Sequence, residues 1–262
     1  MFVQIIRFTI QIFFTHKTYI KISSVVLMVL TWQLVSWASK DPSLVPPVDV
    51  LFLKFIEMIS TNELVFHGLE SLRRVVVSFL FGSITGIGLG LLCSSSQFIW
   101  KFLEIPLDFI RSIPPIGFVP LTISWFGIGE FSKYLVICYL TVIVVAFSTV
   151  ASINQVNQNR IRAARCLGLY GWRLFWLIII PSTSKDIVNA LQLTLGLSFI
   201  SLVAVEIIGS TSGLGFIIMD SRLLLQTDRM IVTIIFIGIL GISTVFIFNL
   251  ILRLSGLMRF TR

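Results

Sequence analysis

The sequence predicts an all-α fold, a polytopic bundle of about six transmembrane helices. Hydrophobic residues make up 56% of the 262 residues and charged residues only 12%, and the mean hydropathy is +0.99. Such a chain is too apolar to expose its whole surface to water. Several windows reach the roughly 20 apolar residues that a helix needs to cross about 30 Å of hydrocarbon. The alternating ten-residue strands of a membrane barrel do not occur in the sequence.

We expect the spans at residues 22–38, 75–93, 107–126, 135–152, 187–208 and 231–252. Before them, residues 1–21 mix apolar and basic side chains and fit either a short interfacial helix or a solvated basic tail. The run KDPSLVPP at 40–47 breaks the helix, and 48–72 is amphipathic enough to lie along the outer surface. These features divide the chain into an N-terminal tail, first span and external linker (1–70), a transmembrane domain (71–252) and a C-terminal tail (253–262).

The basic residues favour an orientation with both termini in the cytoplasm. With that orientation, 12 of the 20 basic residues lie inside, as the positive-inside rule favours: Arg7, Lys17, Lys21, Lys101, Arg160, Arg162, Arg165, Arg173, Lys185, Arg253, Arg259 and Arg262. The isoelectric point near 9.8 therefore reflects membrane topology, and we expect lipid rather than nucleic acid around the chain. The three cysteines show no disulfide or metal spacing, and the two histidines are isolated, so no catalytic cluster is predicted.

The second span carries Gly82, Gly86 and Gly90 at four-residue spacing. Glycines on one helix face let another helix approach closely, so this face is predicted to be a packing surface. A phosphate-binding loop is excluded because the segment lies in mid-membrane and lacks the Gly-Lys-Ser/Thr ending of that motif.

The third span is interrupted by Arg111 and by Pro114 with the prolines that follow it. Proline removes a backbone donor, so a bent or partly re-entrant helix is expected here. Such a break suits either a pathway wall or a packing kink, and Arg111 either faces the pathway or reaches toward the inner boundary.

The fifth span has polar or small residues on two faces. Asn189, Gln192, Gly196, Phe199, Val203 and Glu206 share one face, and Thr194, Ser198 and Ser201 occupy the other. A carboxylate in the membrane must be protonated, paired or water-facing, which leaves Glu206 a role in the transport path or a structural hydrogen bond. Ser198 and Ser201 are likewise pathway candidates, or they bond back to the preceding turn.

A loop of about 34 residues, 153–186, joins the fourth and fifth spans on the inside. It combines a short helix carrying small residues (Ala163, Ala164 and Gly168) with four arginines and an apolar turn that leads to Pro181. A small, basic, partly apolar helix suits a groove on a partner protein, or alternatively anionic lipid headgroups.

The spacing of these residues resembles a known family. Gly168 follows the two alanines after three residues, and Ile178, Ile180 and Pro181 follow after nine more. This order and spacing are similar to the cytoplasmic signature of the membrane subunits of bacterial ABC importers. The upstream segment RSIPPIGFVPLTISWFGIGEFSK and the downstream segment VAVEIIGSTSGLGFIIMDSRLLLQTD resemble permeases of the nitrate, sulfonate, taurine and bicarbonate group. The resemblance covers roughly residues 72–252, with three motifs in the family's order.

The resemblance implies a MetI-like type I importer permease in the inner (plasma) membrane of a bacterial cell. Two copies of the chain would line the pathway, and a periplasmic or lipid-anchored binding protein would deliver a sulfonate, taurine, nitrate or bicarbonate type of solute. A thiamine-precursor pyrimidine is an alternative substrate. An ATP-independent secondary transporter is less favoured, because the sequence shows no convincing inverted repeat.

The same resemblance makes the inside loop a coupling helix for two ATP-binding cassette ATPase subunits. The implied ATPase-contacting residues are Arg162, Ala163, Ala164, Arg165, Gly168 and Pro181. ATP and Mg would bind on the ATPase, and no cofactor is expected on this chain, which is a transport subunit and not an enzyme. The family pattern has Glu where this chain has Arg162, so either the partner ATPase presents a complementary acid or the position tolerates both charges.

Overall fold

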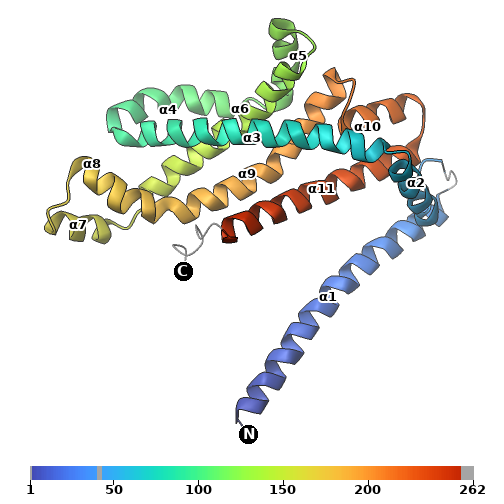
Figure 1. Ribbon diagram of the computed structural model, residues 1–262, viewed down its shortest axis with the longest axis horizontal. Coiled ribbons are helices and arrows are strands. Elements are labelled where there is room, and N and C mark those ends of the chain that lie inside the picture. The colour runs from blue at the N-terminus through green and yellow to red at the C-terminus, as the bar shows by residue number, and fades with distance from the viewer. Residues whose placement is uncertain (1, 40–42, 255–262) are drawn as a thin grey trace.

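The computed structural model describes residues 2–39 and 43–254, and these form helices and connecting loops without a strand. The predicted all-α bundle is therefore confirmed (Figure 1). In chain order the helices are α1 (Phe2–Ala38), α2 (Val48–Ser60), α3 (Glu63–Ser95), α4 (Gln97–Arg111), α5 (Pro115–Phe126), α6 (Glu130–Asn154), α7 (Gln158–Cys166), α8 (Gly171–Leu174), the π-helix η1 (Phe175–Ile179), α9 (Ile180–Gly209), α10 (Leu214–Leu223) and α11 (Thr227–Leu254).

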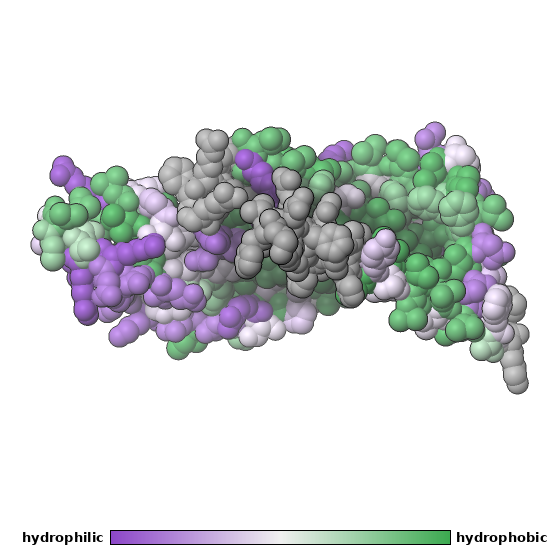
Figure 2. Space-filling model, turned by 90° about the horizontal axis from the view of Figure 1, so that it is seen from below, coloured by the Kyte–Doolittle hydropathy of each residue, from purple (hydrophilic) through white to green (hydrophobic). Residues whose placement is uncertain are grey.

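Four helical segments are long and apolar enough to cross a membrane: Glu63–Ser95, Glu130–Asn154, Gly171–Gly209 and Thr227–Leu254. They run along the long axis of the molecule, with α7 at one end and α10 at the other (Figure 1). We call these the α7 end and the α10 end. Seen from below, hydrophilic side chains gather at the α7 end, on the left of Figure 2, whereas apolar side chains dominate the opposite part.

The third predicted span, 107–126, is wrong as a single crossing helix. The structure divides this part of the chain into α4 and α5, which are separated by residues 112–114. The helix stops because Pro114 has extended backbone and Pro115 occupies the first turn of α5, where its missing N–H is tolerated. Helix α4 begins at Gln97, ten residues before the predicted start.

Two other predicted boundaries also move. The second predicted span begins at Glu63, so residues 63–72 of the linker predicted along the outer surface belong to α3. The inside loop is shorter than predicted, because helix resumes at Gly171 and continues through η1 into α9. The first two residues of the predicted tail at 253–262 continue α11, and the rest of the tail lies outside the described residues.

Helices α3, α6 and α9 enclose the main core, which includes Val75, Phe79, Val136, Ile137, Leu202 and Val205. Glycines allow α3 to lie close to α6. A Cβ added at Gly82 or Gly90 would stand 2.6 Å from the Cβ of Thr141 or Thr149, and one at Gly86 would stand 2.9 Å from the Val142 carbonyl oxygen. Such separations are shorter than van der Waals contact, so the backbones meet where the sequence places the glycine face.

Helix α1 leaves the bundle beside α2 and points away from the other helices (Figure 1). It is continuous from Phe2 to Ala38, so residues 2–21 do not form a separate interfacial helix. Its contact with the rest of the chain is made at its C-terminal end, where Trp32 Nε1 donates to the Pro46 carbonyl at 3.0 Å and Ser36 Oγ donates to the Val45 carbonyl at 2.8 Å.

Candidate functional site

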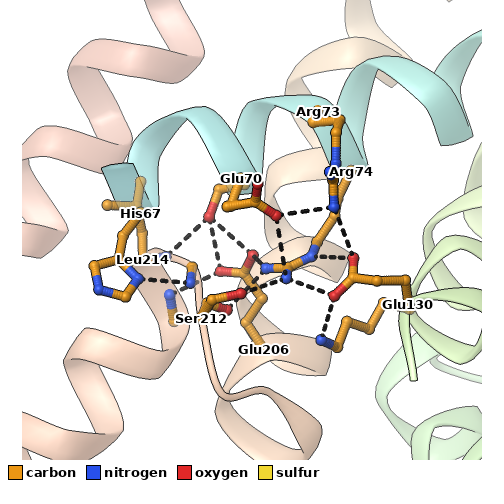
Figure 3. Close-up of polar contacts among 12 residues, drawn as sticks. His67, Glu70, Arg73, Arg74, Glu130, Glu206, Ser212 and Leu214 are labelled. Atoms are coloured by element: carbon orange, nitrogen blue, oxygen red, sulfur yellow. Dashed lines mark hydrogen bonds and ion pairs between the residues drawn. The ribbon is translucent and has the colours of Figure 1, made fainter. Parts of the chain in front are cut away.

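A buried ion pair lies at the α10 end of the bundle (Figure 3). Arg74 of α3 and Glu206 of α9 both have 0% exposed side chains, and Arg74 Nη1 lies 2.6 Å from Glu206 Oε1. The Glu206 carboxylate also accepts from Ser71 Oγ at 2.8 Å and from the Gly215 amide at 2.8 Å. Each charge is thus matched by an opposite charge and by further hydrogen bonds, the condition for burying ions without a large penalty.

Every donor of the Arg74 guanidinium is used. Nε donates to Glu130 Oε2 at 2.8 Å, and Nη2 donates to Glu130 Oε1 at 2.7 Å. Two parallel bonds to one carboxylate are the bidentate geometry specific to arginine. The remaining bonds go from Nη1 to Glu206 and to the Ser212 carbonyl, and from Nη2 to the Ser212 hydroxyl. Five N–H groups have five partners, so one side chain joins α3, α6, α9 and the loop before α10 (Figure 3).

The same side chains cap the N-terminus of α10. The first amides of a helix lack partners within the helix and carry a partial positive charge. Here the Gly213 amide donates to His67 Nδ1 at 2.9 Å, the Leu214 amide to Ser71 Oγ at 2.9 Å, and the Gly215 amide to Glu206. Gly213 has φ 110°, and a Cβ there would collide with the Glu206 carboxylate, so glycine is required at this turn.

A second ion cluster lies at the rim of the same end. Arg229 of α11 donates to Glu63 of α3 at 2.5 Å and to Asp220 of α10 at 2.6 Å. Together the two clusters hold α3, α6, α9, α10 and α11 in one arrangement. Their side chains are bonded to one another and to the backbone of neighbouring elements, an arrangement that fixes helices and loops.

Sequence reasoning singled out Glu206 but missed its partners. The predicted spans begin at residues 75 and 135, which leaves both Arg74 and Glu130 outside them. One feature of the sequence could have led to Arg74. A buried glutamate needs a cation beside it, and an arginine at the same end of a neighbouring span can supply that charge.

The pathway residues predicted on α9 are enclosed by the protomer. Ser198, Ser201 and Glu206 are 0%, 2% and 0% exposed. Ser198 Oγ donates to the Thr194 carbonyl four residues back, the local bonding that the sequence left open. In this chain, these three side chains are therefore covered by neighbouring helices. Arg111 and Pro114, the other two predicted pathway residues, are exposed.

At the α7 end, the structure divides the predicted coupling residues into two groups. Arg162, Ala163, Arg165 and Gly168 are exposed, whereas Ala164 is only 4% exposed. Ala164 is the buried member of the predicted contact set, and it lines a hollow beside α7. Gly168 ends the helix with φ 81°, and the Leu169 amide returns to the Ala164 carbonyl at 3.0 Å, as in a glycine helix stop.

Between α7 and the start of α9 the surface is hollowed. A hollow of about 460 Å³ is lined by Arg160, Ala163, Ala164, Leu167, Leu169, Leu177, Ile178, Pro181 and Ser182. Pro181 lies inside a continuous helix and not at the exit of a loop, and the π-helical turn η1 directly precedes it, with the Ile180 amide donating five residues back to Phe175. A proline removes one helix hydrogen bond, and a π-bulge is a common local adjustment at such a position.

The sequence matches a protein-family model for the binding-protein-dependent transport system inner membrane component over residues 82–256. Among similar proteins, the taurine transport system permease protein TauC of Escherichia coli (strain K12) is 31% identical over 82% of this chain and 80% of its own length. The nitrate import permease protein NrtB of Synechocystis sp. is 27% identical over 84% of this chain and 82% of its own length. These relatives are transport permease subunits and not enzymes.

Solved structures show the same fold. A chain of an amino acid ABC transporter superposes with a TM-score of 0.62 at 21% identity, covering 77% of this chain and 96% of that one. A chain of the MetNI methionine ABC transporter gives 0.57 at 19% identity, covering 68% and 93%. With its helical bundle, its exposed α7 and its family match, the chain belongs to the binding-protein-dependent transport system inner membrane component family.

Proposed function

We propose that this chain is the pathway-forming permease subunit of an ATP-driven importer. Two copies line a central route, an ATPase subunit docks on each α7 from the cytoplasm, and a binding protein delivers the solute to the α10 end. Both termini are then on the cytoplasmic side. This chain has no Walker A motif, so ATP and Mg bind on the ATPase.

The observation that carries the proposal is the surface of α7. This nine-residue helix stands at the tip of the bundle, with arginines around Ala163 and a hollow beside it. Most of its residues are exposed, and the hollow beside it is lined both by Ala163 and Ala164 of α7 and by Ile178 and Pro181 of the helix that continues into α9. A partner that moves α7 therefore acts directly on a spanning helix, which is the mechanical requirement of alternating access.

We infer that the solute is a small oxyanion of the sulfonate or nitrate type. Relatives named for taurine, aliphatic sulfonates and nitrate support this class. A solute that is a pyrimidine would contradict it. Arg162, which replaces the acid of the family pattern, predicts an acidic side chain in the docking site of the partner ATPase.

The docking proposal is tested by introducing bulk on α7. Ala163→Trp adds a large side chain to an exposed position without touching the packed core, so we expect the permease to fold but to lose its ATPase subunit during affinity purification. Coupled ATP hydrolysis should fall at least tenfold. Glu57→Trp, at an exposed position of α2 at the opposite end, is the matched control and should keep both.

Arg162→Glu should also weaken retention, because it reverses the charge that faces the partner. Full retention of the ATPase and unchanged hydrolysis in the Ala163→Trp variant would show that α7 is not the docking surface.

A further inference from the structure

Helix α4 carries a stripe of charged residues along its length. Lys101, Glu104, Asp108 and Arg111 recur at spacings of three and four and so share one face. A second face, with Leu103 and Leu107, packs on the ends of α3 and α6. A third face is apolar and widely exposed, and consists of Phe98, Phe102, Ile105 and Phe109.

Arg111 lies on the surface of the bundle but well away from the ends of α6. Its guanidinium stands 4.4 Å from the ring centre of Phe147, and the neighbouring Ile110 carbonyl accepts from Tyr139. Phe147 is seven residues from the nearer end of α6, and Tyr139 is nine. At 1.5 Å per residue these positions are about 10 Å or more from either end of a spanning helix.

The charges at this depth are not covered by the protomer. The side chains of Arg111 and Asp108 are 55% and 48% exposed and lie 2.9 Å apart, and Asp108 is the one ion-pair partner of Arg111 among the described residues. An arginine facing lipid at the helix centre costs about 2.5 to 3.5 kcal/mol even on the lenient insertion scale. The exposed apolar face of α4 suits lipid, so we expect the charged stripe to face water or protein.

The backbone next to Arg111 adds a second positive element. Helix α5 starts at Pro115, four residues on, after the break, and a helix N-terminus carries a partial positive charge. Tyr139 holds the break by donating to the carbonyls of Ile110 at 2.5 Å and Ile113 at 3.1 Å. In many membrane transporters, a helix is broken in the membrane and the N-terminus of the half after the break points at an anionic substrate.

We infer that the α4 stripe faces the translocation pathway and that Arg111 is the anion-binding residue of this permease, with Asp108 as its resting counter-ion. This inference rests on the proposed function and names its substrate site. The planar guanidinium matches two oxygens of a sulfonate or nitrate, and an entering anion replaces the Asp108 carboxylate. The ring of Phe147 keeps the guanidinium in place during that exchange.

Thiol labelling of the assembled transporter tests the site without a transported solute. Cys93, Cys138 and Cys166 are first replaced by alanine, and Ser112→Cys places a reporter beside Arg111. Membrane-impermeant methanethiosulfonates of opposite charge are then compared. We expect both to react, with the anionic reagent favoured. The matched control is Phe109→Cys on the apolar face of the same helix turn, which should stay unlabelled.

Variants of the ion pair should shift the labelling ratio in opposite directions. Arg111→Gln should lower the anionic-to-cationic rate ratio at position 112 at least fivefold, Arg111→Lys should largely keep it, and Asp108→Asn should raise it. An unlabelled reporter, or a ratio that Arg111→Gln does not change, would overturn the inference.

Uptake by proteoliposomes separates this inference from the proposed function. If the wild-type transporter imports taurine or nitrate, Arg111→Gln should reduce that uptake at least tenfold. Normal uptake by this variant would overturn the assignment of Arg111 as the anion site and leave the proposed function intact. If the wild type imports neither taurine, alkanesulfonate nor nitrate while the labelling ratios behave as expected, the proposed substrates are wrong and the anion site stands.

Discussion

At the residue scale, the feature that most constrains the molecule is the complete use of the Arg74 guanidinium. Its five donors have five acceptors, drawn from Glu130, Glu206 and Ser212. Lysine has three donors and no planar fork, so it cannot serve both carboxylates and the loop together. A buried charge that loses its partners is far more costly than the same loss at the surface.

We therefore expect Arg74→Lys to destabilise the protein by on the order of 3 kcal/mol. The measurement is thermal unfolding of the purified permease in detergent. Arg73→Lys is the matched control, because the neighbouring side chain is 52% exposed and pairs only at the surface with Glu70 and Glu130. Its effect should stay within about 0.5 kcal/mol. Equal melting temperatures for the two variants would contradict the role assigned to Arg74.

The network also shows why sequence reasoning reaches one partner and not the others. A carboxylate in an apolar run is conspicuous, and Glu206 is identified for that reason. Its cation lies 132 residues away in the chain, and the selection of Arg74 over Arg73 depends on which side of α3 faces α9. That orientation follows from packing among three helices, which no local pattern encodes.

At the scale of elements, α3 and α6 approach each other closely along three glycines. The glycine spacing predicts a packing face because it depends only on helix periodicity, and the structure places these glycines against Thr141, Val142 and Thr149. The α4–α5 break is partly predictable, since the prolines mark it. The length of α4 cannot be predicted in the same way. The charged residues at 101 and 104 are typical of a loop between spans, and only the structure shows them on a helix that packs on α3 and α6.

Gly86→Ala should destabilise the α3–α6 contact by about 1 to 3 kcal/mol, because the added methyl would stand 2.9 Å from both the Val142 carbonyl oxygen and the Val145 Cβ. Gly88→Ala, two residues along the same helix, meets nothing within 4 Å and should be neutral or slightly stabilising. Unfolding in detergent compares the two. A Gly86→Ala variant as stable as the Gly88→Ala variant would show that the helices can separate at no cost.

At the scale of the whole molecule, the two ends have different designs. The α10 end is locked by two ion clusters that join five helices, whereas the α7 end presents a mostly exposed helix. Under the proposed function, force applied to α7 would enter the continuous helix from Gly171 to Gly209, which carries Glu206 near its far end. The stripe on α4 lies between these ends. This layout suits a subunit that transmits motion supplied by another protein.

The most direct test of this account is solute uptake by proteoliposomes that contain the permease, its ATPase and its binding protein. The account predicts accumulation of labelled taurine, alkanesulfonate or nitrate that requires ATP and the binding protein together and is lost when the ATPase cannot hydrolyse ATP. Equal uptake in the absence of ATP, driven by the solute gradient alone, would contradict the claim that this chain is the permease of an ATP-driven importer.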